Sequence, residues 1–288
     1  MSSTTIFINT SHLDLFFFIN QVILLANFLV GFGWCKVIQE PIDNRTIQDV
    51  DNQAWRIEPD EDGNYRIDDM VMDEVTFKRN FGTDEENAKL DRQGLPKGIN
   101  EWPNKELPYV ISSEFSYANR QKIKSAIQNF NNVFAGCFKI RSIMPWDKNW
   151  VNVRPVSGDG CSAPIGNQGR GAHDLKLNPY CCDCLEEYTI QHEFIHAIGF
   201  FHVQSWPDRD QFVTINWNNV QKGHNNHNFW KQRNSETYGV KYDPRSFMHY
   251  WWNSHALNKK YATITWKVSW FVQHDLVRQK GYNLILEK

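Results

Sequence analysis

The sequence predicts an α+β fold, and three observations lead to this prediction. In residues 117–135, apolar side chains fall at helical spacing (Ile123, Ala126, Ile127, Phe130 and Phe134). Residues 139–141 and 150–153 alternate between polar and apolar side chains, as strands do. Residues 185–200 predict a second helix, and the part that follows Gly199 carries few regular signals, so we expect an irregular C-terminal half. The 288 residues are enough for one good-sized domain with additional segments.

The N-terminal region differs from the rest of the chain. Residues 13–34 are mostly apolar and include a single charged residue, Asp14. We interpret residues 1–33 as a secretory signal peptide that is cleaved after Gly33. The alternative is a retained membrane anchor, because the stretch is long for a signal and no Lys or Arg precedes it. Its Asn and Gln side chains disfavour an anchor, so we expect secretion and no stable membrane association.

Composition places further limits on function. The 31 basic and 33 acidic residues give a net charge of −2, which indicates neither nucleic acid nor a strongly charged partner. Residues 36–92 are acidic and interrupted by turn-forming residues, and they show no helical or strand period. We therefore expect an extended segment there rather than a folded domain.

The run from His192 to His202 has the pattern H-E-x-x-H-x-x-G-x-x-H, which predicts a metal site with its own general base. On a helix, His192 and His196 leave the same face, because four residues rotate by about 400° and rise by about 6 Å. Their two nitrogens can bind one zinc ion at about 2.0–2.1 Å each. Glu193 lies at the edge of that face, where it can reach a water on the metal without binding the metal.

Gly199 explains how a third ligand reaches the same ion. A continuing helix would carry position 202 away from His192 and His196, whereas a glycine can take the left-handed conformation that ends a helix. The chain can then turn and bring His202 back. Three protein ligands leave a fourth position for water, which is typical of catalytic zinc. A purely structural zinc site would not explain Glu193.

With these residues, the segment resembles the astacin family of metzincin peptidases. The family continues after the third His with E-x-x-R-x-D-R-D, and this chain carries Asp208, Arg209 and Asp210 in the matching places. Val203 and Trp206 depart from the pattern, since Glu and Arg are expected there. The resemblance implies a metzincin-like catalytic domain with two subdomains, a mixed sheet, a zinc-binding helix and an irregular C-terminal half.

A second match lies at residues 242–250, where Ser246-Phe247-Met248-His249-Tyr250 resembles the family's Met-turn. By resemblance, Met248 forms the hydrophobic floor below the metal ligands. Tyr250 would be a fifth zinc ligand at rest and would hydrogen-bond the oxyanion in the transition state. The resemblance extends over roughly residues 102–282, and it places the strand expected at 173–177 along the substrate cleft.

The resemblance divides the chain into a signal peptide (1–33), a propeptide (34–92) and an astacin-like peptidase domain (93–288). The family keeps its zymogen inactive with a propeptide Asp in an F-x-G-D-M setting. Asp69 in Arg66-Ile67-Asp68-Asp69-Met70 is the first candidate, although the expected Phe and Gly are absent, and Asp84 is the second.

Cleavage after Arg92 would place the new N-terminus at Gln93. In the family, the freed amine pairs with the Glu that follows the third His. Val203 cannot form that pair, and an unpaired buried ammonium is costly. We therefore expect a mature N-terminus that is frayed or bound elsewhere.

The cysteines agree with secretion. By the family's spacing, Cys184 should pair with Cys161. The family's other bridge joins the position of Cys137 to a Cys near the C-terminus, but Leu284 lies about where that partner would be. Cys137 then pairs with Cys181 or Cys182, which leaves one cysteine free or intermolecular. A metal site in the Cys-Cys-x-Cys cluster is the less favoured alternative.

The resemblance implies a secreted, monomeric zinc endopeptidase that is made as a zymogen and acts on protein or peptide substrates. Glu193 would be the general base, and Tyr250 would help the metal to stabilise the oxyanion. The alternative is a catalytically inactive, secreted binding protein, because Val203 and Trp206 depart from the pattern. The presence of every group that hydrolysis needs favours the enzyme. The sequence leaves the substrate open.

Overall fold

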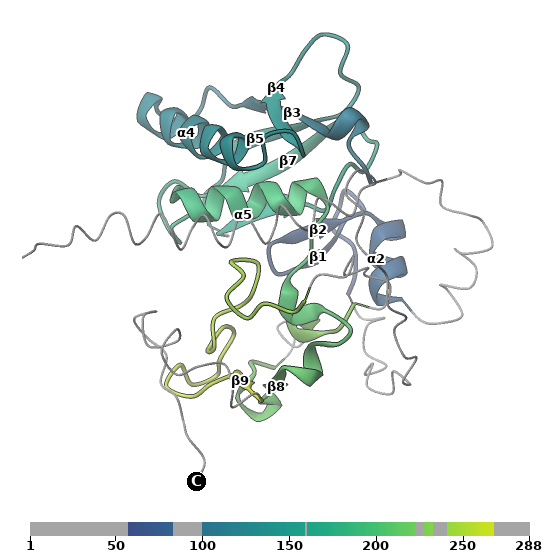
Figure 1. The fold of residues 1–288 in the computed structure, drawn as a ribbon, viewed down its shortest axis with the longest axis vertical. Helices are drawn as coiled ribbons and strands as arrows, with labels where there is room; N and C mark the ends of the chain where they lie inside the picture. Colours follow the sequence, from purple (N-terminus) through teal and green to yellow (C-terminus); the bar gives the residue numbers. More distant parts are fainter. Residues whose placement is uncertain (1–56, 83–99, 159, 223–226, 233–240, 268–288) are drawn as a thin grey trace, which may run out of the picture.

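The computed structural model describes residues 57–82, 100–158, 160–222, 227–232 and 241–267 (Figure 1). Several predictions lie outside these ranges: the signal peptide, the second candidate switch (Asp84) and the cleavage site (Arg92 and Gln93). None of the helices in the described ranges is both long enough and apolar enough to span a membrane.

Seven strands form one sheet. In spatial order they are β1 (Tyr65–Ile67), β2 (Met70–Met72), β6 (Cys161–Pro164), β7 (Ala172–Leu177), β5 (Trp150–Pro155), β3 (Glu106–Ile111) and β4 (Lys139–Ser142). β7, β5, β3 and β4 pair in parallel, whereas β6 runs antiparallel to β7 and β1 runs antiparallel to β2. The predicted mixed sheet is confirmed, and so are the strands predicted at 139–141, 150–153 and 173–177.

Two long helices pack beside this sheet. α4 (Tyr117–Val133) begins after Ser116, whose side-chain oxygen accepts a hydrogen bond of 3.2 Å from the backbone N–H of Asn119. Its buried residues are those that the helical spacing predicts (Ile123, Ala126, Ile127 and Phe130). α4 packs against α5 (Glu187–Ile198), as Figure 1 shows. Both predicted helices are confirmed.

Residues 57–82 form small elements, so the prediction of a purely extended segment is wrong. β1 and β2 make a hairpin, and Asp73 caps α2 (Glu74–Phe81) by accepting a hydrogen bond of 2.7 Å from the N–H of Thr76. The apolar side chains of the segment form a second core together with Ile165, which directly follows β6 (Ile67, Met70, Met72, Phe77, Phe81 and Ile165). Strands of three residues are too short to produce a visible period.

The hairpin adds to the outer edge of β6. The N–H of Ala163 donates to the carbonyl of Asp69 at 2.8 Å, and the N–H of Ile165 donates to the carbonyl of Val71 at 2.9 Å. β2 and β6 therefore run parallel. The expectation that residues 173–177 line the cleft is wrong, because β7 uses both of its edges to pair with β5 and β6.

The C-terminal half is irregular, as predicted, and Figure 1 shows it on the side of α5 away from α4. It holds a two-stranded sheet of β8 (Val213–Ile215) and β9 (Ile264–Trp266). Its other elements are single 3₁₀ turns (η3, Val203–Ser205; η4, Arg209–Gln211; η5, Trp217–Asn219; η6, His227–Phe229). One more such turn, η2 (Pro103–Lys105), precedes β3 in the N-terminal half. Val203 and Trp206, the two residues that differ from the family pattern after the third histidine, are both buried in the main core.

One of the disulfide predictions is confirmed and one is wrong. Cys161 and Cys184 are bridged, which ties β6 to the segment before α5. Cys181 and Cys182 are bridged to each other, so neither pairs with Cys137, and among the described residues Cys137 is the free thiol. The chain takes a left-handed conformation at Cys182, with φ of 66°, in the turn that holds the adjacent pair.

Candidate metal centre

α5 carries the first two histidines of the motif and ends directly after them. Gly199 has φ of 126°, a region that L-residues with a side chain rarely adopt. Its N–H donates to the carbonyl of His196 at 2.8 Å, and the N–H of Phe200 donates to the carbonyl of Ile195 at 3.1 Å. These bonds close the helix and turn the chain, which brings His202 back towards His196.

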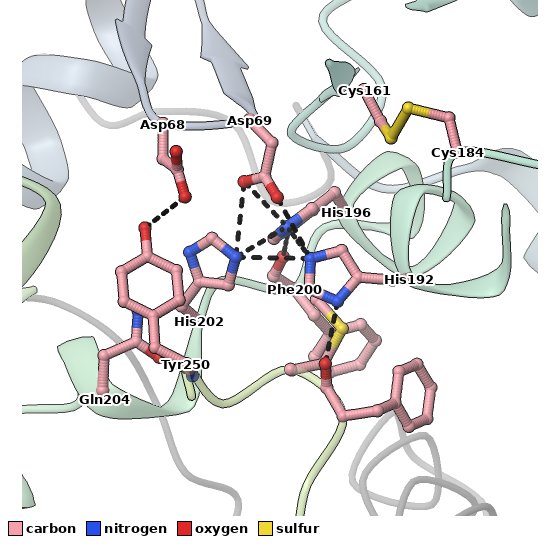
Figure 2. Close-up of polar contacts among 12 residues, drawn as sticks. Asp68, Asp69, Cys161, Cys184, His192, His196, Phe200, His202, Gln204 and Tyr250 are labelled. Atoms are coloured by element: carbon pink, nitrogen blue, oxygen red, sulfur yellow. Dashed lines mark hydrogen bonds and ion pairs between the residues drawn. A yellow bond between two sulfur atoms is a disulfide. The ribbon is translucent and has the colours of Figure 1, made fainter. Parts of the chain in front are cut away.

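Three imidazoles converge at one point, as Figure 2 shows. The Nε2 atoms of His192 and His196 lie 3.0 Å apart, and the Nε2 of His202 lies 3.3 Å from each of them. Three nitrogens at about 2.0–2.1 Å from a tetrahedral ion would be separated by about 3.3–3.4 Å. The separations therefore fit a single metal ion.

The outer ring nitrogens support the same conclusion. The Nδ1 of His192 bonds the carbonyl of Phe247 at 2.9 Å, and the Nδ1 of His196 bonds the carbonyl of Phe200 at 2.6 Å. A carbonyl only accepts, so in the neutral rings the proton sits on Nδ1 and the lone pair on Nε2. Lone pairs that face one another cannot form hydrogen bonds, whereas a cation between them satisfies them all. The residues present therefore fit a metal ion.

Asp69 reaches this cluster from the hairpin between β1 and β2. Its carboxylate lies 3.2 Å from Nε2 of His192, 3.5 Å from that of His196 and 3.3 Å from that of His202. The four side chains form a group able to hold a metal ion. Burial alone would raise the pKa of Asp69, but the nearby histidines outweigh burial and hold this pKa well below its usual value. The other candidate, Asp84, lies outside the described residues.

Glu193 is buried beside the cluster with 1% of its surface exposed. Within the described part of the chain, its Oε2 has no hydrogen-bond partner. Burial raises the pKa of Glu193 well above its usual value, and the negative charges of Asp69 and Asp68 raise it further. A carboxyl whose pKa is raised in this way is suited to accept and return a proton near neutral pH.

Tyr250 lies next to His202, with ring centroids 4.7 Å apart. Its hydroxyl donates a hydrogen bond of 2.5 Å to Oδ2 of Asp68, and Figure 2 shows this pair next to Asp69. Burial raises the pKa of Tyr250 well above its usual value, and Asp68 and Asp69 raise it further, so the phenol keeps its proton. Its expected binding to the metal stays a prediction.

The backbone of the Met-turn is hydrogen-bonded to the segment that carries the histidines. Met248 is buried, and its carbonyl accepts a hydrogen bond of 2.9 Å from the N–H of Val203, directly after the third histidine. The preceding carbonyl, that of Phe247, orients His192. The backbone of the turn therefore holds the first and third histidines in place.

Two residues at this site were not expected from the sequence. Asp68 stands where the resemblance expects Gly, and its φ of 55° explains why a glycine would suit the position. His255 places Nε2 at 3.3 Å from the same carboxylate oxygen that Tyr250 binds. The missing glycine was a visible signal for Asp68, whereas nothing in the sequence around His255 marks it.

The family model described as Astacin, a peptidase family, matches residues 95–280, which is more than half of the chain. The chain belongs to the astacin family. This confirms the resemblance that the histidine motif and the Met-turn indicate. The matched residues include all three histidines, Glu193 and Tyr250.

Individual astacin relatives agree with this assignment. The chain is 31% identical over 261 residues to Meprin A subunit beta of Rattus norvegicus, covering 88% of this chain and 33% of that protein. It is 33% identical over 160 residues to zinc metalloproteinase nas-8 of Steinernema carpocapsae, covering 55% of this chain and 36% of that protein. The chain thus spans about a third of the length of these relatives.

A solved structure has a similar fold. It is that of High choriolytic enzyme 1, a hatching enzyme zinc-protease from Oryzias latipes. The two chains share 32% identity with a TM-score of 0.51, over 58% of this chain and 80% of that one. The predicted α+β, metzincin-like fold is confirmed by this likeness.

Proposed function

We propose that this astacin is a secreted zinc endopeptidase that is made as a zymogen and hydrolyses peptide bonds in protein or peptide substrates. The observation that supports this proposal most is the convergence of three Nε2 atoms next to the buried Glu193, whose Oε2 has no hydrogen-bond partner among the described residues. A site with three histidines keeps a position for water, and a general base is already beside it.

Zinc at this site would lower the pKa of a water ligand towards about 7 and polarise the scissile carbonyl. Glu193 would accept the proton of the attacking water and pass it to the leaving amine. The raised pKa of Glu193, whose largest cause is burial, suits both steps, because the carboxyl must hold the proton between them. His192, His196 and His202 are the proposed metal ligands.

Tyr250 would donate a hydrogen bond from its hydroxyl to the oxyanion that forms in the transition state. The raised pKa of this phenol keeps the donor protonated over the whole neutral range. In the intact chain the hydroxyl is engaged with Asp68, so Tyr250 becomes available only when the N-terminal segment leaves.

Latency would come from Asp69. Its carboxylate faces all three Nε2 atoms, which is where water and substrate must bind. The backbone bonds of the hairpin to Ala163 and Ile165 hold it there. Cleavage of the chain after Arg92 would allow this segment to dissociate.

The test uses the full-length protein before and after limited proteolysis. We expect about one zinc per chain by elemental analysis and chelator-sensitive cleavage of a quenched fluorescent peptide after proteolysis. Glu193→Gln should lower kcat/KM by about 10²–10⁴-fold and retain the zinc, because a general base contributes that much. Glu186→Gln is the matched control, since Glu186 lies at the start of the same helix and is more than half exposed.

Two results would contradict the proposal. Full activity of Glu193→Gln would exclude this mechanism. Stoichiometric zinc without any peptide cleavage after the segment is removed would indicate the inactive binding protein instead.

A further inference from the structure

Three large apolar side chains of the C-terminal half are exposed and take no part in the metal centre. Trp217, Leu257 and Tyr261 have 50%, 57% and 59% of their surface exposed. Such side chains are common one at a time, whereas a group of them marks an interaction site. Trp217 belongs to η5 and the other two lie in the loop before β9, so they form a group only if the structure brings these two segments together.

The two segments lie side by side. They pair as β8 with β9 at one end and through an isolated antiparallel bridge at the other. Between these pairings, the carbonyl of Asn219 accepts a hydrogen bond of 2.7 Å from the N–H of Leu257, and its Nδ2 donates one of 2.8 Å to the carbonyl of Tyr261. Trp217, Leu257 and Tyr261 therefore form one patch, which we call the apolar tip. Figure 1 shows β8 and β9 at the end of the C-terminal half away from α4.

The loop of the apolar tip is ordered by its own hydrogen bonds. Oδ1 of Asn258 accepts from the N–H of Lys260 at 3.0 Å, and the carbonyl of Asn258 accepts from the N–H of Tyr261 at 3.0 Å. Nδ2 of Asn253 donates to the carbonyl of Lys259 at 3.0 Å. A loop that is already ordered loses little conformational entropy when it binds. The exposed side chains are therefore in place before any partner arrives.

The surroundings of the apolar tip are basic, although the whole chain has a net charge of −2. Residues 211–222 and 251–267 contain four lysines and no Asp or Glu. All four lysines are exposed. Lys259 and Lys260 stand in the chain between two of the apolar residues. A partner that fits this patch must combine negative charge with an apolar phase.

We propose that the apolar tip docks this protein on an anionic lipid surface. Tryptophan and tyrosine rings settle at the level of the lipid headgroups, a leucine reaches the acyl chains, and lysines are attracted to the negative headgroups. Docking of this kind is peripheral and reversible, which agrees with the expectation of no stable membrane association. It does not depend on the proposed peptidase activity.

Two other partners fit the patch less well. A second copy of this chain would place lysines against lysines across a symmetric contact, and such like-charge pairs are costly. A soluble polyanion, such as a sulfated polysaccharide, would pair with the lysines but would leave Leu257 in water. A lipid surface accommodates both kinds of side chain.

The first experiment measures co-sedimentation of the full-length protein with two kinds of vesicle. One is made of phosphatidylcholine alone, and the other also contains phosphatidylserine. We expect tighter binding to the anionic vesicles, and we expect this preference to disappear as salt approaches about 1 M, where the Debye length is about 3 Å. The apolar stretch at residues 13–34 has no Lys or Arg, so it does not favour the anionic vesicles.

The double variant Lys259→Gln/Lys260→Gln tests the charges. Each lysine near an anionic surface raises the affinity by about fivefold, so the affinity for the phosphatidylserine vesicles should fall by about 25-fold. Lys124→Gln/Lys139→Gln is the matched control, because it removes the same charge from exposed positions on α4 and β4, at the other end of the molecule (Figure 1). At physiological salt the control should change the affinity by less than about twofold.

The variant Leu257→Ser tests the apolar contact. Burial of the exposed part of a leucine raises an affinity by about tenfold, so binding to the anionic vesicles should weaken by about that factor. The preference for phosphatidylserine should remain, because the lysines are unchanged. Met144→Ser is the matched control, since Met144 has a comparable apolar side chain that is 42% exposed after β4. An unchanged Tm in each variant would show that the fold is kept.

The outcomes separate lipid docking from the other partners. Equal affinity for the two kinds of vesicle, or equal losses in the variants and their controls, would overturn the proposal. If only the lysine variant weakens binding, and soluble dextran sulfate binds as tightly as the vesicles, the partner is a soluble polyanion and the lipid surface is wrong. Self-association without vesicles that Leu257→Ser abolishes would assign the patch to a second copy of this chain. None of these readouts uses peptide cleavage, so a failure of the proposed peptidase function would leave them unaffected.

Discussion

Asp68→Asn should raise the peptide-cleaving activity of the intact protein, before any proteolysis. The substitution keeps the shape of the side chain and its tolerance of φ near 55°, but it removes the negative charge that faces Tyr250 and His255. Asp69 stays in place at the three histidines, so the variant isolates the contribution of the neighbouring carboxylate to holding the segment against the metal centre.

The size of the effect follows from the contacts. A hydrogen bond to a charged group contributes about 1.5–3 kcal/mol, against about 0.5–1.5 kcal/mol for a neutral pair. The side-chain amide of the variant can still accept from Tyr250, so the change should weaken the closed state by about 1–2 kcal/mol. The fraction of open molecules, and with it the basal activity, should then rise by about 5- to 30-fold.

The assay is the initial rate of peptide cleavage by the full-length protein before any proteolysis, with a gel to show that the chain stays uncut. Glu74→Gln is the matched control, because Glu74 belongs to the same segment but is exposed and pairs with Lys78 across one helical turn. If the initial rate of Asp68→Asn is no higher than that of the control, the Asp68 contact does not contribute to latency.

Three further predictions concern stability. Gly199→Ala should lower the unfolding free energy by about 1–3 kcal/mol and lower the Tm, because φ of 126° strains any side chain there; an unchanged Tm would refute this. Replacing Cys161 and Cys184 together with Ser should cost about 3 kcal/mol in urea unfolding, since the bridge closes a separation of 23 residues. Unchanged unfolding in reducing agent would count against the bridge. Burial lowers the pKa of His249 to about 4, so the unfolded state binds the extra proton and stability should fall as pH drops from about 6.5 towards 4. In His249→Gln, the unfolding free energy from urea titrations should differ less between about pH 7 and about pH 5 than it does in the unmodified protein. An unaltered difference would contradict the assignment to His249.

The sequence predicted best what depends on local spacing. His192, His196 and His202 lie within one turn-terminated helix and the turn after it, so their spacing and one glycine are enough to bring them together. The amphipathic helix α4 was predicted for the same reason.

Some contacts between distant segments were not predicted, because neither local spacing nor the family resemblance pointed to them. Asp68 meets Tyr250 across 182 residues and His255 across 187, and no periodicity reports on such a separation. β6 was missed because Cys161–Pro164 contains no β-branched residue and ends in proline. The pairing of Cys181 with Cys182 depends on a left-handed turn that spacing does not reveal.

The parallel pairing of β2 with β6 has a consequence for handling the protein. While the hairpin is in place, the backbone N–H groups of Ala163 and Ile165 are hydrogen-bonded to it, so these two described residues do not form an unpaired edge. If the proposed cleavage releases the hairpin, the same amides would become a template for any extended chain, including a second copy of this protein. We therefore expect the protein to self-associate at high concentration more readily after that cleavage than as the intact chain.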